Sequence, residues 1–215
     1  MLTVHHLGVS QSERIVWLCE ELEIPYELKV YDRDPVTRMG PPEYKALHPM
    51  GTAPIITDGK VTLPETAAIM EYIIGKYGDG RLTVGPDAPN FADYLFWLHF
   101  ANGSMLPRQS AASASAAARP EGAEESPRAK FIRERAETAW SLVEQRLGET
   151  PWFAGEAFTA ADIIMVFSLT TMRVFAPRDL TPYPNILAYL QRVGARPAYR
   201  RAMAKGDPGM TLLLT

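Results

Sequence analysis

The spacing of apolar residues changes near Gly78, and this change limits the folds open to the chain. Before this point short β-prone stretches alternate with helical patterns, and after it only helical patterns occur. Strands are predicted at residues 2–5, 26–31, 53–57 and 60–63, with helices at 12–22, near 43–47 and from Glu65 to Tyr77. The predicted order is βαβ, then (α)ββα, then helices alone.

Residues 79–90 are rich in Gly, Pro and Asp, a composition typical of a linker. We therefore predict an α+β protein with an α/β domain at 1–78, a linker at 79–90 and an all-helical domain at 91–215. The sheet should mix parallel and antiparallel strands. Helical patterns cover 91–105, 128–147, the apolar stretch after Ala161, and 183–204 with a break near Arg196-Pro197. The predicted core face of 128–147 carries Phe131, Trp140, Val143 and Leu147. The alanines of 110–127 favour a helix, whereas its later Ser, Pro and Gly favour a mobile surface segment.

Composition excludes several classes of protein. A single cysteine, Cys19, permits no intrachain disulfide and favours a reducing cytoplasm. No apolar run is long enough to span a membrane, and no secretory signal is visible. A net charge of −3 disfavours binding to nucleic acid. The four histidines lack the spacing of metal ligands, so we expect no metal and treat each histidine as structural.

Pro54 stands where the first strand of a hairpin should begin, a place that suits either a strand's first residue or a special backbone geometry. The order of elements around it resembles the thioredoxin fold. That resemblance implies a cis bond between Ala53 and Pro54, which turns the main chain of Ala53 outward toward a ligand. The turn after the first strand, LGVSQSER, has no cysteine, so disulfide exchange by a dithiol is excluded.

A thioredoxin-like domain without cysteines, fused to a helical domain, resembles the cytosolic glutathione transferases of the serine-using, bacterial-like type. Four stretches carry the resemblance, which covers nearly the whole chain: SQSERIVWLCEEL, HPMGTAPIITDG, LPETAAIMEYI and FTAADI. In the last stretch Thr159 and Asp162 have the spacing of a capping box. We expect both residues to be buried and structural.

The resemblance implies that glutathione is the co-substrate and that a serine hydroxyl near the start of the first helix activates its thiol. In the family the catalytic hydroxyl lies four positions before an arginine of the first helix. Here that arginine is Arg14, so the resemblance implies that Ser10 is the catalytic residue. Ser12 is the alternative catalytic residue, and it is also suited to cap the helix. On a third interpretation both serines are turn or capping residues.

The remaining glutathione contacts follow from the same resemblance. Thr66 should hold the γ-glutamyl carboxylate at a helix N-terminus, with Glu65 facing the ammonium, although a simple helix cap is the other interpretation. The bend at Thr52, Ala53 and Pro54 should contact the tripeptide by its main chain, in the manner of strand addition. Relatives often have His or Lys where this chain has Gly51 and Thr52, so Arg38 or Lys45 would have to hold the glycine carboxylate.

For the second substrate, the family's layout implies an apolar wall. Its predicted residues are Leu7, Phe100, Ser104, Met105 and Pro107. The resulting hypothesis is a detoxifying, cytoplasmic glutathione transferase that forms a homodimer and acts on small hydrophobic electrophiles. The alternatives are a glutathione-dependent peroxidase, isomerase or dehalogenase, or a non-catalytic glutathione-binding or scaffolding protein.

Overall fold

The computed structural model describes all residues from 1 to 215, and these form two compact units. One comprises Met1–Thr83 together with Gln191–Leu213, and we call it the α/β unit; the other, the helical unit, comprises Val84–Leu190 and Leu214–Thr215. The sequence pattern predicts that 191–213 belong to the helical domain. In the structure these residues group with the α/β unit, because helix α9 (Pro197–Gly206) packs against helix α1 (Glu13–Leu22).

The α/β unit is built on a mixed four-stranded sheet, as predicted. Its strand order is β2 (Glu27–Tyr31), β1 (Leu2–Leu7), β3 (Ile55–Asp58), β4 (Val61–Pro64). Strands β1 and β2 run parallel, and β3 is antiparallel to both of its neighbours. Within this register His5 lies opposite Ile55, and Ile55 lies opposite Pro64. The C-terminal ends of β1 and β4 and the start of β3 therefore share one end of the sheet.

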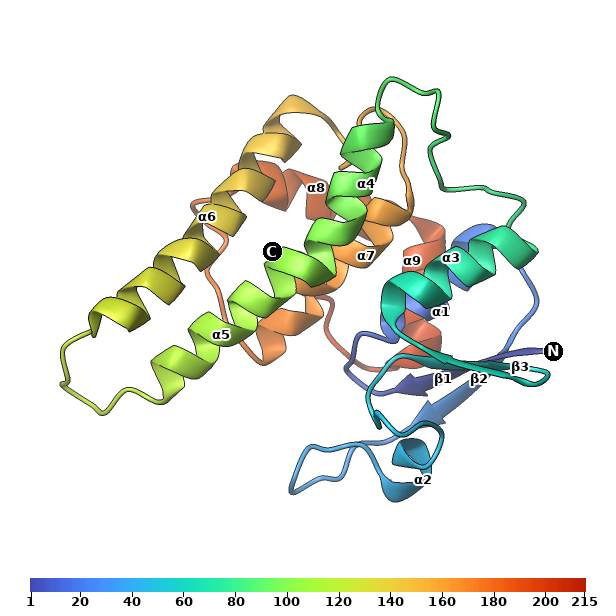
Figure 1. The fold of residues 1–215 in the computed structure, drawn as a ribbon, viewed down its shortest axis with the longest axis horizontal. Helices are drawn as coiled ribbons and strands as arrows, with labels where there is room; N and C mark the ends of the chain where they lie inside the picture. Colours follow the sequence, from blue (N-terminus) through green and yellow to red (C-terminus); the bar gives the residue numbers. More distant parts are fainter. The chain divides into compact units, whose positions relative to one another are not determined.

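Helices cover both faces of the sheet. Figure 1 shows α1, α3 (Thr66–Tyr77) and α9 on one face, and the short α2 (Pro42–Lys45) on the other. Helix α1 contacts β1, α3 and α9, so all but one of its residues are buried. Four apolar residues at helical spacing lie in this core: Ile15, Leu18, Cys19 and Leu22. Cys19 is a free, buried thiol.

The helical unit contains α4 (Phe91–Phe100), α5 (Leu106–Ala117), α6 (Pro127–Glu149), α7 (Ala160–Leu169) and the first part of α8 (Pro184–Ala195). A π-helical turn, η1 (Ala101–Met105), joins α4 to α5, and a short 3-10 turn, η2 (Thr171–Val174), follows α7. The predicted helix at 91–105 is therefore an α-helix that ends in a π turn, a feature often found at functional positions. The alanines extend α5 to Ala117, and residues 118–126 lie outside any helix.

Helix α7 forms the centre of this unit, and every one of its residues is buried. It begins with the predicted capping box: the backbone N–H of Thr159 donates to Asp162 Oδ2 at 2.8 Å, and the Thr159 hydroxyl accepts in return from the start of the helix.

The prediction that Phe131 faces the core of α6 is wrong. Its side chain is 57% exposed, whereas Trp140, Val143 and Leu147 are buried as predicted. Phe131 precedes Trp140 by about two and a half helical turns, which places it on the opposite side of the helix.

Candidate functional site

The predicted glutathione-binding segments meet at one end of the sheet. The turn of residues 8–12, which contains Ser10 and Ser12 and which we call the serine turn, follows β1. The Ala53-Pro54 bend precedes β3, and Glu65-Thr66 follows β4. The strand register brings these three ends side by side. The bond between Ala53 and Pro54 is cis, as the sequence analysis expects. Ala53 packs against the buried cluster of Leu7, Tyr44 and Ile55.

Ser10 and Ser12 contact each other, and their hydroxyl oxygens lie 2.7 Å apart. Ser12 occupies the N-cap position of α1, but its side chain makes no capping hydrogen bond. Its Oγ instead accepts from the Leu7 N–H at 3.1 Å and lies 2.9 Å from Nδ1 of His6. Ser10 Oγ accepts from the Ser12 N–H at 3.2 Å. Ser12 is therefore the N-cap residue of α1, as one interpretation expects, but its hydroxyl does not cap the helix N–H groups.

A histidine and an aspartate that the sequence analysis did not assign to the site complete this hydrogen-bonded chain. His6 Nε2 lies 3.1 Å from Oδ2 of Asp207, and Oδ1 of Asp207 accepts from the Val9 N–H at 2.7 Å. The His6 side chain is fully buried and that of Asp207 is 5% exposed. Asp207 directly follows α9, and no sequence signal connects it to a residue 201 positions earlier.

The backbone of the serine turn is held from a second side by Arg33. Its Nε donates to the Gly8 carbonyl at 2.7 Å and its Nη2 to the Val9 carbonyl at 3.0 Å. Its Nη1 donates to the Arg38 carbonyl at 2.7 Å. Burial lowers the pKa of Arg33, and the nearby Arg38 lowers it further. Arg33 thus ties the turn before α1 to the loop that follows β2.

The start of α3 has an unusual backbone. Glu65 occupies its N-cap position with φ 75° and ψ 116°, a region that residues other than glycine rarely adopt. Its side chain is exposed, whereas the side chain of Thr66 is buried. Neither acts as a side-chain cap of α3, so the first N–H groups of the helix keep their positive potential for an anion.

The three other predicted glutathione residues lie at the surface of the α/β unit. Thr52, Arg38 and Lys45 are exposed, and Arg38 has a positive φ of 61°. The Cα, Cβ and Cγ atoms of Lys45 lie close to Gly51, whose φ is 59°. Lys45 therefore lies beside the segment that leads into the cis bond, whereas Arg38 belongs to the loop that Arg33 holds.

The residues predicted to line the second-substrate site lie in different parts of the structure. Leu7 is buried in the core of the α/β unit, and Met105 is fully buried in the helical unit. In the helical unit, Phe100 and Ser104 line one open groove with Leu95, Phe96 and His99. Ser104 and Pro107 line another with Phe131, Ile132 and Arg135. Gly103 and Ser104 line both grooves.

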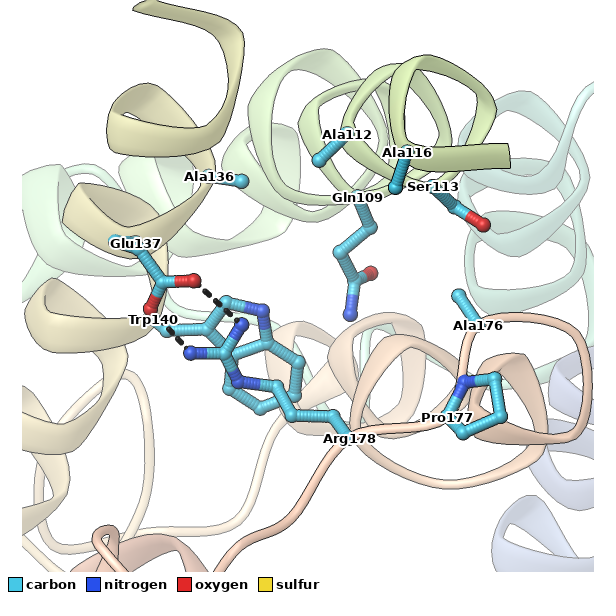
Figure 2. Close-up of a pocket in the computed structure, with 10 residues that line it drawn as sticks. All are labelled: Gln109, Ala112, Ser113, Ala116, Ala136, Glu137, Trp140, Ala176, Pro177 and Arg178. Carbon is cyan, nitrogen blue, oxygen red and sulfur yellow. Dashed lines mark hydrogen bonds and ion pairs between the residues drawn. The ribbon is translucent and has the colours of Figure 1, made fainter. Parts of the chain in front are cut away.

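A separate cavity of about 300 Å³ lies within the helical unit, between α5, α6 and residues 176–178 (Figure 2). The Arg178 guanidinium lies 4.6 Å from the centre of the Trp140 ring and forms an ion pair with Glu137. Gln109 points toward the cavity and donates from Nε2 to the Ser168 carbonyl at 2.9 Å. Its buried Oε1 accepts no hydrogen bond. This cavity includes none of the predicted site residues.

Three further features concern the single cysteine, possible metal ligands and the apolar character of the helices. Burial, together with the neighbouring Glu20, raises the pKa of the Cys19 thiol far above its ordinary range, so Cys19 is unsuited to thiolate chemistry. No cluster of three or more His, Cys, Asp or Glu side chains is arranged to hold a metal ion. None of the helices has both the length and the apolar character needed to cross a bilayer.

Comparison with known proteins identifies the family. The profile described as "Glutathione S-transferase, N-terminal domain" matches residues 10–74, and that described as "Glutathione S-transferase, C-terminal domain" matches residues 108–201. Glutathione S-transferase 3 of Schizosaccharomyces pombe is 35% identical over the whole chain and 92% of its own length. The chain belongs to the glutathione S-transferase family.

Solved structures of family members agree with this assignment. A glutathione S-transferase from Actinobacillus pleuropneumoniae is 34% identical, with a TM-score of 0.87 over 96% of this chain and 93% of that one. A glutathione transferase from Phanerochaete chrysosporium, solved with oxidised glutathione, is 23% identical with a TM-score of 0.73 over 95% of this chain and 94% of that one. The second likeness concerns the fold. The transferase fold predicted from the sequence, a thioredoxin-like domain followed by helices, is confirmed.

Proposed function

We propose that this family member is a glutathione transferase that binds glutathione at the shared end of the sheet and activates its thiol. The observation that carries the proposal is the position of Ser10, whose hydroxyl lies at the start of α1 at the same sheet end as Ala53 and Thr66. An unperturbed thiol is mostly protonated at neutral pH, and transfer requires the thiolate. A hydroxyl donor and the positive end of a helix dipole both favour that thiolate.

The rest of the tripeptide follows the sheet edge. The main chain of Ala53 pairs with the cysteinyl backbone, and Thr66 with the first N–H groups of α3 holds the γ-glutamyl carboxylate. Glu65 faces the ammonium group. Lys45 is the better of the two candidates for the glycine carboxylate, because it lies beside Gly51, whereas Arg38 belongs to the loop that Arg33 holds.

Conjugation of glutathione with chlorodinitrobenzene tests the activity. We expect turnover by the wild type and a loss of at least about tenfold in kcat for Ser10→Ala. Ser110→Ala, at an exposed position of α5, is the matched control and should behave like the wild type. Calorimetry with glutathione, together with activity assays, separates the alternatives. Binding of glutathione without turnover of a broad panel of electrophiles would indicate a scaffolding protein. Turnover of peroxides alone would indicate a peroxidase.

The second substrate is proposed to be a small, largely apolar electrophile that contacts Phe100, Ser104 and Pro107. The apolar lining of the two grooves that share Ser104 supports this choice. Phe100→Ala should raise the KM for the electrophile while leaving the KM for glutathione within about twofold. An equal effect on both substrates would contradict the assignment.

We further propose a homodimer in the cytoplasm with a role in detoxification. Membership of the glutathione S-transferase family, whose resemblance implies a homodimer, supports this proposal. Light scattering at micromolar concentration should give twice the mass of the chain, and a monomeric mass would contradict the proposal. Cell fractionation and the electrophile tolerance of a deletion strain test the location and the role.

A further inference from the structure

The serine turn is connected to a buried charge through an unbroken chain of hydrogen bonds. From the sheet end inward, the chain consists of Ser10, Ser12, His6 and Asp207, with successive contacts of 2.7, 2.9 and 3.1 Å. All four side chains lie in the α/β unit and are nearly or fully buried. Gly206 makes room for the imidazole, since a Cβ there would lie 3.1 Å from His6 Nε2.

When Asp207 is ionised and His6 is neutral, the contact distances select one pattern of donors and acceptors along these four side chains. A carboxylate only accepts, so His6 Nε2 carries the ring proton and donates it to Asp207. His6 Nδ1 then has a free lone pair, which accepts from the Ser12 hydroxyl.

The assignment of protons and lone pairs continues from Ser12 to Ser10. Ser12 Oγ accepts from the Leu7 N–H, and two acceptors are within reach of its one proton: His6 Nδ1 at 2.9 Å and the Leu7 carbonyl at 3.4 Å. The shorter contact assigns the proton to His6, and the remaining lone pair of Ser12 accepts from the Ser10 hydroxyl. Ser10 Oγ accepts from the Ser12 N–H and keeps one lone pair for an outside donor. In the free protein, therefore, Ser10 presents an acceptor and not a donor at its free side.

On the basis of the proposed function, we propose that His6, held by Asp207, receives the proton of the glutathione thiol through Ser12 and Ser10. The S–H bond breaks as its proton passes to Ser10 Oγ. The former proton of Ser10 moves to Ser12, and that of Ser12 moves to His6 Nδ1. The two hydroxyl groups are unchanged overall, a thiolate and an imidazolium have formed, and the Ser10 hydroxyl now donates to sulfur.

The product state is electrostatically favourable. The imidazolium is formed next to the Asp207 carboxylate, and the thiolate faces a hydroxyl donor and the N-terminus of α1. After the sulfur has attacked the electrophile, the proton returns along the same path to Ser10 and leaves with the departing group or to water. Ser10 touches the reacting atom, whereas Ser12, His6 and Asp207 act through it as positioning residues.

Other charged groups lie near these hydrogen-bonded side chains and also affect how the activity depends on pH. Arg33 interacts with Asp207 and holds the carbonyl groups of Gly8 and Val9. Glu13 and Arg14 are buried directly after Ser12 in the sequence. His5 belongs to a different network, since its ring contacts Tyr31 and Thr57. Variants of His6 and Asp207 must therefore be compared with the wild type at constant ionic strength.

Asp207→Asn is the decisive variant because it changes the proton pattern and hardly changes the shape. The Val9 N–H fixes the amide oxygen, so the amide NH₂ faces His6 Nε2 and donates to it. The His6 proton then lies on Nδ1, which can no longer accept from Ser12. We expect kcat to fall at least about tenfold and the pKa of the bound glutathione thiol, followed by ultraviolet thiolate absorbance, to rise. Asp87→Asn, at an exposed linker position, is the control.

Two readouts separate this inference from the proposed function. If the wild type neither binds nor conjugates glutathione, the proposed function fails. If the wild type is active and folded Asp207→Asn keeps its kcat and its thiol pKa, only the proton path is wrong. His6→Asn, which keeps an acceptor near Nδ1 but does not titrate, should resemble Asp207→Asn.

A measurement on the wild type covers the case in which these variants do not fold. The ¹⁵N resonances of the His6 ring should change from neutral to imidazolium when glutathione binds, and should stay neutral with S-methylglutathione, which has no thiol proton. A ring that remains neutral with bound glutathione thiolate would overturn the proposal.

Discussion

The hydroxyl oxygens of Ser10 and Ser12 lie 2.7 Å apart, yet the two side chains differ in what else they hold. Ser12 satisfies the Leu7 N–H and contacts His6, whereas Ser10 accepts only the Ser12 N–H within the protein. The same substitution at the two positions should therefore have different consequences.

Ser12→Ala should destabilise the protein by about 1–3 kcal/mol, because it leaves the buried Leu7 N–H without an acceptor. Ser10→Ala should cost less than about 1 kcal/mol, because its hydroxyl satisfies one backbone group at the edge of the site. Urea unfolding measures both values. Equal losses of stability would mean that Ser12 has no special structural role.

Gly206→Ala should reduce activity with little effect on the affinity for S-methylglutathione, which has no thiol proton to transfer. The added Cβ would lie 3.1–3.4 Å from three atoms of the His6 ring and would displace it from Asp207 or Ser12. Steady-state kinetics should show a fall in kcat, and calorimetry an unchanged Kd for S-methylglutathione. Gly75→Ala is the control, since a Cβ at that helical glycine meets no atom within 4 Å.

Thr66→Val should raise the KM for glutathione about tenfold or more, with a smaller change in kcat. Valine keeps the shape of threonine but removes the hydroxyl proposed to hold the γ-glutamyl carboxylate. Thr66→Ser keeps the hydroxyl and should stay within a few fold of the wild type. A valine variant with the KM of the wild type would remove Thr66 from the site.

Asp58 should make the stability of the protein depend on acid pH. Hydrogen bonds from Lys76 at 2.5 Å and from Tyr77 at 2.5 Å hold the pKa of its carboxyl group well below the ordinary range. A lowered folded-state pKa contributes stability that is present above the unfolded pKa, near 4, and is lost as the pH falls through the folded value.

Asp58→Asn should therefore be less stable than the wild type at pH 7, and the difference should shrink as the pH falls from about 5 toward 2. Urea unfolding at several pH values gives the comparison. A difference that stays constant down to pH 2 would show that the ionised carboxylate is not the source of the stabilisation.

Cys19 should not react with a thiol reagent in the native protein and should react promptly after unfolding. Its side chain is fully buried, and burial raises the pKa of its thiol. Cys19→Ala should keep the transferase activity within about twofold. Loss of activity in a folded Cys19→Ala variant would point to cysteine chemistry that the structure does not support.

The fold was largely predictable because its signals are local. The alternating strands, the apolar stripe of α1 and the capping box at Thr159 and Asp162 depend on neighbours a few residues away. Phe131 belongs to the right helix but to its exposed side, because about two and a half helical turns separate it from the buried Trp140. An aromatic residue near a predicted stripe was assigned to it by hydrophobicity alone.

The candidate site was predictable only in part. Motif spacing selected Ser10, Ser12, Ala53 and Thr66, and the strand register brings their segments together. His6 and Asp207 were missed because the histidine is one of four without a pattern and the aspartate follows the last helix. The packing of α9 on α1 also moves 191–213 from the helical domain to the α/β unit.

By itself, the sequence determined which segments become strands and helices. It also determined where the serine turn, the bend at Ala53-Pro54 and the Glu65-Thr66 pair lie along the chain. These are properties of short stretches, set by backbone preferences and periodic burial. Only the tertiary structure decided that the carboxylate of Asp207 meets the ring of His6. That contact joins residues 201 positions apart, and it exists because two helices bury their apolar faces against each other.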